Sequence, residues 1–176
     1  MRKMNKKIEN LILDVDGVLT TGQFLYIKTG KYAKVFGPHD SDGIKMISKH
    51  IKVLAVTADR RGFAITKKRV RNDMKLPLSF VKEEERLEWM KNNFDLSKTV
   101  YMGDGIFDAF IFKYVKYSIA PNNAFYLAKE KADFVTRHNA GEGAVAEACM
   151  HLLDKFLGGT GQMRSLLLPN SGVRKK

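Results

Sequence analysis

Apolar strand-like runs alternate with helix-like segments along most of the chain, and this alternation restricts the fold more than any other feature. The strand-like runs are short and rich in β-branched residues, whereas the segments between them carry apolar residues at helical spacing. The strand-like runs cover residues 10–15, 52–57, 99–104, 117–120 and 133–136, and the helix-like segments cover residues 40–50, 62–74, 83–94, 106–115, 123–131 and 142–156. Strands that are apolar on both faces and alternate with helices are typical of a parallel sheet covered on both sides. The sequence therefore predicts an α/β fold with a doubly wound parallel sheet.

One segment, residues 22–37, departs from the alternation. Its sequence "GQFLYIKTGKYAKVFG" reads as two strands around "KTGK", and glycine favours a tight hairpin turn. We expect a β-hairpin flap in place of a cap domain, because no other stretch is long enough for a separate cap. Residues 1–159 are thus predicted to form a single domain, followed by a flexible C-terminal tail over residues 160–176 that is glycine-rich and then apolar.

The formal charge of +12 raises the question of nucleic-acid binding. Eight of the 31 basic residues lie in residues 1–7 and 160–176, which contain no acid, and residues 8–159 hold the other 23 bases against 19 acids. The excess of positive charge therefore lies mostly at the two ends of the chain. Residues 8–159 lack a basic helix with interleaved aromatic residues. We expect no nucleic-acid partner.

Three further features bear on where the protein works. Its one cysteine, Cys149, forms no internal disulfide, which is consistent with a reducing compartment. No apolar run approaches the roughly 20 residues of a membrane span. The first ten residues are basic but lack the apolar stretch of a secretory signal. The expected location is the cytoplasm, without a membrane partner.

Acidic side chains follow two of the predicted strands. "LILDVDGVLT" places Asp14 and Asp16 at the end of the first strand, and "VYMGDGIFD" places Asp104 after a later strand and Asp108 at the start of a helix. Thr57 ends a third strand. Because ligands bind at the carboxyl ends of the strands in such sheets, we expect these residues to lie close together.

Paired carboxylates at a strand end suit phosphoryl transfer through a covalent intermediate. That chemistry needs a carboxylate nucleophile, a proton donor for the leaving alcohol and a cation to screen the phosphate, and Mg²⁺ prefers oxygen ligands. Two acids at this spacing are also common on solvated surfaces, and Asp108 could equally favour the dipole of its own helix. Ionised carboxylates after an apolar strand, however, need a partner or a metal.

The segments "DVDGVLT", "AVT" and "GDGIFD", in this order, resemble the motifs of the haloacid dehalogenase superfamily across residues 8–157. The hairpin, "DSDGIKMI" and "ADFVTRHNAGEGAVAEA" resemble the branch of 3-deoxy-D-manno-octulosonate 8-phosphate phosphatases. This resemblance implies a magnesium-dependent phosphatase that hydrolyses a small phosphorylated sugar acid through an aspartyl phosphate.

The resemblance also implies roles for individual residues. Asp14 matches the nucleophile, and Asp16 matches the general acid and base. The magnesium ligands match Asp14, the main-chain carbonyl of Asp16 and Asp104, with Asp108 holding the coordination shell or a metal-bound water. Thr57 matches the hydroxyl residue that binds a phosphoryl oxygen.

The chain departs from the branch in two places. Asp59 occupies the position of an arginine, so Arg60 or Arg61 would have to supply the substrate contact. The branch also places a lysine before the helix that precedes the metal-binding strand, and the candidates here are Arg86, the better match, and Lys82. Arginine stays charged and can hold a phosphate by two bonds, so the role can survive the exchange.

Two other functions stay open at this point. The substrate could be a nonulosonate 9-phosphate of the sialic acid type, or the chain could be an inactive regulatory or binding homologue, which would be expected to have lost Asp14 or Asp16. We further expect a homotetramer, because a small chain without a cap leaves its catalytic crevice open to water. Phe24, Leu25, Tyr32 and Val35 of the hairpin would pack on neighbouring chains, and Arg164 of the tail is a candidate contact to the substrate's carboxylate in an adjacent site.

Overall fold

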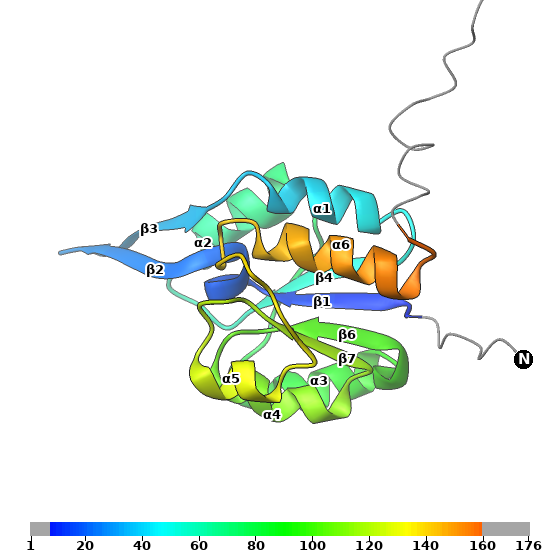
Figure 1. Ribbon diagram of the computed structural model, residues 1–176. Helices are drawn as coiled ribbons and strands as arrows, with labels where there is room; N and C mark the ends of the chain where they lie inside the picture. Colours follow the sequence, from blue (N-terminus) through cyan, green and yellow to red (C-terminus); the bar gives the residue numbers. More distant parts are fainter. Residues whose placement is uncertain (1–7, 160–176) are drawn as a thin grey trace, which may run out of the picture.

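The structure is a computed structural model, and it describes residues 8–159 (Figure 1). Six parallel strands form the central sheet in the order β5-β4-β1-β6-β7-β8. Their bounds are β1 (Asn10–Asp14), β4 (Lys52–Thr57), β5 (Leu78–Phe80), β6 (Thr99–Met102), β7 (Tyr117–Ala120) and β8 (Phe134–Val135). The doubly wound parallel sheet predicted from the sequence is confirmed.

Helices cover both faces of this sheet, with α1 and α6 on one side and α3, α4 and α5 on the other (Figure 1). Their bounds are α1 (Asp40–Ile47), α2 (Phe63–Thr66), α3 (Arg86–Asn93), α4 (Ile106–Ile111), α5 (Tyr126–Lys131) and α6 (Ala144–Phe156), and short 3₁₀ or π turns cover Val15–Leu19, Lys67–Asp73, Glu83–Glu85, Leu96–Lys98 and Phe112–Tyr114. Successive residues of β1 point to opposite faces, so Leu11 and Leu13 enter the α1–α6 core while Ile12 enters the α3–α5 core. The two cores hold β1 in the middle of the sheet.

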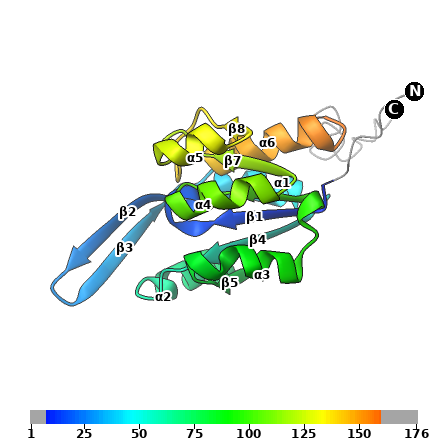
Figure 2. The ribbon, with the colours of Figure 1, turned by 90° about the horizontal axis from the view of Figure 1, so that it is seen from below.

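The hairpin forms a separate two-stranded sheet of β2 (Thr20–Ile27) and β3 (Gly30–Phe36). It projects well beyond the central sheet (Figure 2). It turns ahead of Gly30, whose φ of +129° few other residues adopt. The hairpin predicted over residues 22–37 is thus present and begins two residues earlier, at Thr20.

Two differences from the expected elements concern the sheet. β5 was not predicted, because its three residues are too few to show a periodic pattern; it lies at the sheet edge and pairs Ala55 with Leu78 and Thr57 with Phe80. The strand expected to run to residue 104 ends at Met102, which leaves Gly103 and Asp104 in the loop before α4.

Cys149 lies in α6 and is fully buried. Burial raises the pKa of its thiol, as does the nearby Asp40. Within the described part of the chain, no helix is both long and apolar enough to span a membrane. The tail predicted over residues 160–176, with its candidate contact Arg164, lies outside the described residues.

Candidate active site

Asp14 is the last residue of the central strand β1, and its side chain is mostly buried at the carboxyl edge of the sheet. One carboxylate oxygen accepts a hydrogen bond from the backbone N–H of Val15 at 2.8 Å, and the other lies 3.0 Å from Nη1 of Arg86. Burial raises the pKa of Asp14 to about 7; the Arg86 charge opposes this rise and the Asp108 charge adds to it. The position of the strand therefore places a carboxylate where it is costly to ionise without a further cation.

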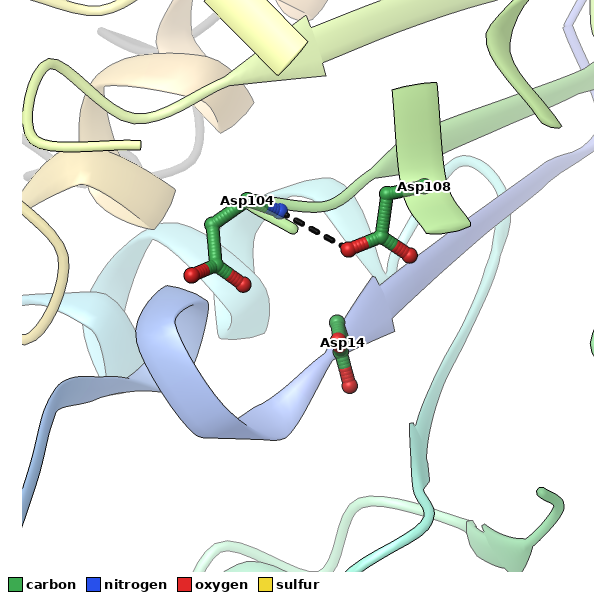
Figure 3. A group of neighbouring side chains, drawn as sticks. All are labelled: Asp14, Asp104 and Asp108. Atoms are coloured by element: carbon green, nitrogen blue, oxygen red, sulfur yellow. Dashed lines mark hydrogen bonds between the residues drawn. The ribbon is translucent and has the colours of Figure 1, made fainter. Parts of the chain in front are cut away.

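Asp14, Asp104 and Asp108 form a three-carboxylate cluster (Figure 3). One oxygen from each lies within 4.8 Å of the others. Burial raises the pKa of Asp104, the charges of Asp14 and Asp108 act in the same direction, and together they bring it to about 8. Hard oxygen ligands that repel one another at this spacing suit Mg²⁺. Of the residues expected from the sequence to share a cation, the structure thus brings together the side chains of Asp14, Asp104 and Asp108.

Two glycines permit this close approach. Gly17 has a φ of +86°, and a Cβ there would overlap the carboxylate of Asp104. A Cβ on Gly103 would overlap the side chain of Asp108. Any larger residue at either position would therefore push the carboxylates apart.

Asp108 is the most firmly held of the three carboxylates. Its Oδ2 accepts hydrogen bonds from the backbone N–H groups of Asp104 (3.0 Å) and Gly105 (2.8 Å) at the start of α4. Its Oδ1 accepts from the hydroxyl of Tyr101 and from Arg86 Nη1, the latter at 3.2 Å. With both oxygens occupied, Asp108 fixes the loop that carries Asp104.

Arg86 is buried at the start of α3 beside the cluster. Its Nη1 lies 3.0 Å from Asp14, 3.2 Å from Asp108 and 2.9 Å from the hydroxyl of Tyr101. Lys82, the other candidate for this role, keeps a half-exposed side chain that pairs with Glu85 at 2.9 Å on the pocket wall. The structure therefore brings Arg86, rather than Lys82, to the acids.

Asp16 contacts a different set of residues. Thr57, at the end of β4, donates its hydroxyl to Asp16 Oδ2 at 3.1 Å. Lys34 of the hairpin places its Nζ 2.6 Å from Asp16 Oδ1. The structure thus joins Asp16 to Thr57, as the spacing of the strands predicts, and adds a lysine from the flap.

A pocket of about 620 Å³ opens over these side chains. The hairpin contributes Gly22, Phe24 and Lys31 to its walls, and α4 contributes Ile106 and Phe107. This volume lies within the range of small-molecule sites. A wider hollow of about 1170 Å³ lies around the opposite ends of β1 and β4, and it contains none of the clustered carboxylates.

The expected substrate contacts lie elsewhere. Arg60 and Arg61 are exposed and do not line this pocket, and the Arg60 guanidinium lies 5.5 Å from the ring centre of Phe80. Asp59, at the position of the expected arginine, does line the pocket and pairs with Lys31 (2.5 Å) and Lys34 (2.7 Å). Burial would raise the pKa of Asp59, but the hydrogen bonds from the two lysines outweigh it and lower the pKa to about 2.

Sequence reasoning missed three residues of the site: Lys31, Lys34 and Tyr101. The tyrosine carried a weak signal, since it is the one side chain with a polar tip among the apolar residues of "VYM". The lysines carried none, because nothing local distinguishes them from the other lysines of this basic chain.

Comparison with known proteins agrees with this geometry. Residues 78–149 match the family described as haloacid dehalogenase-like hydrolase. The 3-deoxy-D-manno-octulosonate 8-phosphate phosphatase of Haemophilus influenzae is 34% identical over 155 residues, covering 82% of this chain and 83% of the relative. The corresponding enzyme of Escherichia coli strain K12 is 32% identical over 157 residues, covering 84% of this chain and 80% of the relative.

The solved structures include the cobalt-bound form of the Haemophilus influenzae deoxy-D-mannose-octulosonate 8-phosphate phosphatase. It matches with a TM-score of 0.78 and 26% identity, over 94% of this chain and 100% of that one. The chain belongs to the haloacid dehalogenase superfamily, on the branch of the 3-deoxy-D-manno-octulosonate 8-phosphate phosphatases, and is a phosphoric monoester hydrolase.

Proposed function

We propose that the protein hydrolyses a small phosphorylated sugar acid, such as 3-deoxy-D-manno-octulosonate 8-phosphate, through an aspartyl phosphate on Asp14. The observation that carries this proposal is the buried Asp14 carboxylate within the three-carboxylate cluster and open to a pocket of about 620 Å³. The names of the relatives at 32–34% identity support the substrate class.

Asp14 acts as the nucleophile in the first step. Its carboxylate oxygen forms a bond to phosphorus while the bond from phosphorus to the sugar oxygen breaks, and Asp16 gives that oxygen a proton. In the second step Asp16 takes a proton from water, the water oxygen bonds to phosphorus, and the Asp14–phosphorus bond breaks to release phosphate. Asp14, the Asp16 main-chain carbonyl and Asp104 would hold Mg²⁺, which would screen the negative charge of the phosphate.

Arg86 and Thr57 hold the reacting group. The guanidinium of Arg86 lies 3.0 Å from Asp14 and is placed to offset the negative charge that gathers around the nucleophile as phosphorus is attacked. The Thr57 hydroxyl donates to Asp16 at 3.1 Å in the free protein and would exchange this bond for one to a phosphoryl oxygen when the substrate binds. Asp108 orients Arg86 and the Asp104 loop.

A second candidate substrate is a nonulosonate 9-phosphate of the sialic acid type. Asp59 favours it, because a carboxylate and not an arginine lines the pocket beside Lys31. An acidic side chain can accept hydrogen bonds from the hydroxyl or amide donors of a longer sugar.

Phosphate release with Mg²⁺ from a panel of esters tests both substrates. The panel contains the octulosonate 8-phosphate, a nonulosonate 9-phosphate and neutral sugar phosphates, with Asp14→Asn as the control for contaminating phosphatase. We expect turnover of one sugar acid at least about tenfold above the neutral sugars and a loss of more than about a hundredfold in Asp14→Asn, or roughly 2.7 kcal/mol of barrier. Preference for neutral sugars would remove the sugar acid assignment, and no turnover of any ester would favour an inactive homologue.

A further inference from the structure

Lys34 is the single buried residue of strand β3, on a hairpin whose other large side chains are mostly exposed. Its side chain is 0% exposed. Burying an ammonium group is costly unless its N–H donors find acceptors. The surroundings of Lys34 must therefore offer it charged and polar partners.

Three acceptors surround its Nζ. Asp16 Oδ1 lies at 2.6 Å, Asp59 Oδ2 at 2.7 Å and the Thr66 hydroxyl at 2.8 Å. The Thr66 hydroxyl accepts a hydrogen bond from Nζ, and the two carboxylates form ion pairs with the ammonium charge. Lys34 is thereby fixed in one place between the hairpin and the loop that follows β4.

Two residues, Thr57 and Lys34, hold the carboxylate of Asp16 from two sides. Thr57 donates to Oδ2 from the end of β4. Oδ1 is buried, and among residues 8–159 its partner is the Lys34 charge. Removing Lys34 would leave that oxygen without a counter-charge and the carboxylate held by a single hydrogen bond.

We propose that Lys34 is a positioning residue that aims Asp16 at the leaving oxygen, so that the hairpin takes part in proton transfer. This inference rests on the proposed role of Asp16 as general acid. The proton that moves belongs to Asp16: it passes to the leaving oxygen as the phosphorus–oxygen bond breaks. Lys34 touches neither the substrate nor the reacting atoms in this scheme and acts by holding Asp16 alone.

A positioning role can be separated from a purely structural one through the leaving group. p-Nitrophenolate leaves readily without a proton, whereas the more basic phenolate benefits from a general acid. Loss of a well-aimed Asp16 should therefore slow phenyl phosphate more than p-nitrophenyl phosphate. Loss of folding or of pocket shape should slow both alike. The ratio of the two rates can be measured whichever sugar acid is the natural substrate.

The experiment measures kcat/KM for both esters, with Mg²⁺, in the full chain and in Lys34→Met and Asp16→Asn. We expect Lys34→Met to lower kcat/KM at least about tenfold more for phenyl phosphate than for p-nitrophenyl phosphate, as part of the hundredfold or larger contribution of a general acid. Asp16→Asn should change the ratio in the same direction. Lys28→Met is the matched control, because it removes an exposed lysine from the same hairpin and should leave the ratio unchanged.

Equal losses on both esters in Lys34→Met, or no loss, would overturn the inference while leaving Asp16 in its role. An unchanged ratio in Asp16→Asn would overturn the role of Asp16 and the inference with it. If Lys34→Met fails to fold, Lys34→Gln keeps a shorter donor at the position and is read by the same ratio. Failure of the unmodified protein to hydrolyse either ester would count against the proposed function itself.

Discussion

Carboxylates crowded at the edge of the sheet make proton release part of metal binding. The pKa of Asp14 is raised to about 7 and that of Asp104 to about 8 by burial and mutual repulsion. Both groups must lose their protons before they bind a cation. Without a metal, the folded state holds these protons more tightly than the unfolded chain does. The stability of the folded state therefore falls as pH rises from about 4 to 8.

The first prediction follows from these pKa values. We expect the affinity for Mg²⁺ to rise steadily from pH 6 to pH 9 in a calorimetric titration, and Mg²⁺ to raise the unfolding temperature more at pH 8 than at pH 6. Asp104→Ala should remove most of the binding, whereas Asp42→Asn, a change at an exposed acid, should not. An affinity that does not depend on pH would mean that other groups hold the ion.

Arg86 and Lys82 give the second prediction. Arg86→Ala leaves Asp14 and Asp108 without their shared cation, so we expect kcat to fall by about a hundredfold or more. Lys82→Ala removes a half-exposed charge paired with Glu85 and should cost less than about tenfold. The reverse order of the two losses, from steady-state kinetics on the same ester, would assign the role to Lys82.

Individual residues of the site differ in how far the sequence predicts them. Asp14, Asp16, Asp104 and Thr57 follow apolar strands, and parallel strands end at a common edge, so their meeting could be foreseen. Lys34 could not be foreseen, because its burial depends on how a hairpin folds back over the loop after β4. Lys34 and Thr66 lie 32 positions apart in the chain, and Lys31 and Asp59 lie 28 positions apart, so no local pattern encodes either contact.

At the scale of elements, ion pairs attach the hairpin to the body of the protein. Lys31 and Lys34 of β3 both contact Asp59 in the loop after β4. Because the pKa of Asp59 is lowered to about 2, these pairs stabilise the folded state at pH values above about 4, and that contribution is lost as the pH falls through about 2. The hairpin's attachment is thus one of the parts of the fold that acid weakens directly.

The third prediction is that Asp59→Asn loosens the hairpin at neutral pH. We expect faster amide hydrogen exchange in β2 and β3, with little change in β1 and β6, because the variant removes the shared counter-charge of two lysines whose side chains are 3% and 0% exposed. Asp73→Asn, at a more exposed acid paired with Lys68, is the control. Uniform exchange across all strands would show that Asp59 supports the whole fold instead.

The elements themselves show where sequence patterns succeed. Longer segments with clear periodicity, such as the helix at Ala144–Phe156 and the strand at Lys52–Thr57, were predicted close to their observed bounds. β5 was missed because a three-residue edge strand is specified by its neighbour β4 rather than by its own composition.

At the scale of the molecule, the hairpin exposes more apolar surface than a single chain needs. Leu25 is 53% exposed, Tyr32 66% and Val35 45%, on a two-stranded sheet that has no layer of its own to cover it. Large exposed apolar side chains concentrated on one element are typical of an interaction surface. We infer that they meet other copies of the chain in a homotetramer.

The fourth prediction tests that assembly. Light scattering should give the molar mass of a tetramer for the unmodified protein and a smaller species for Leu25→Ser combined with Tyr32→Ser. A paired change at exposed side chains of α5 and of the short turn Phe112–Tyr114, Tyr126→Ser with Tyr114→Ser, removes comparable apolar area away from the hairpin and should leave the mass unchanged. A molar mass of one chain for the unmodified protein would contradict the homotetramer.

The fully buried Cys149 turns the chain into its own reporter of opening. It is the one thiol in the sequence, it lies in α6 against the α1–α6 core, and burial raises its pKa. A thiol reagent can reach it only when that core opens, since reaction needs both access and the thiolate. The labelling rate of Cys149 therefore reports how often this core opens, without any added probe. The same measurement is possible in every variant, because each of them keeps Cys149.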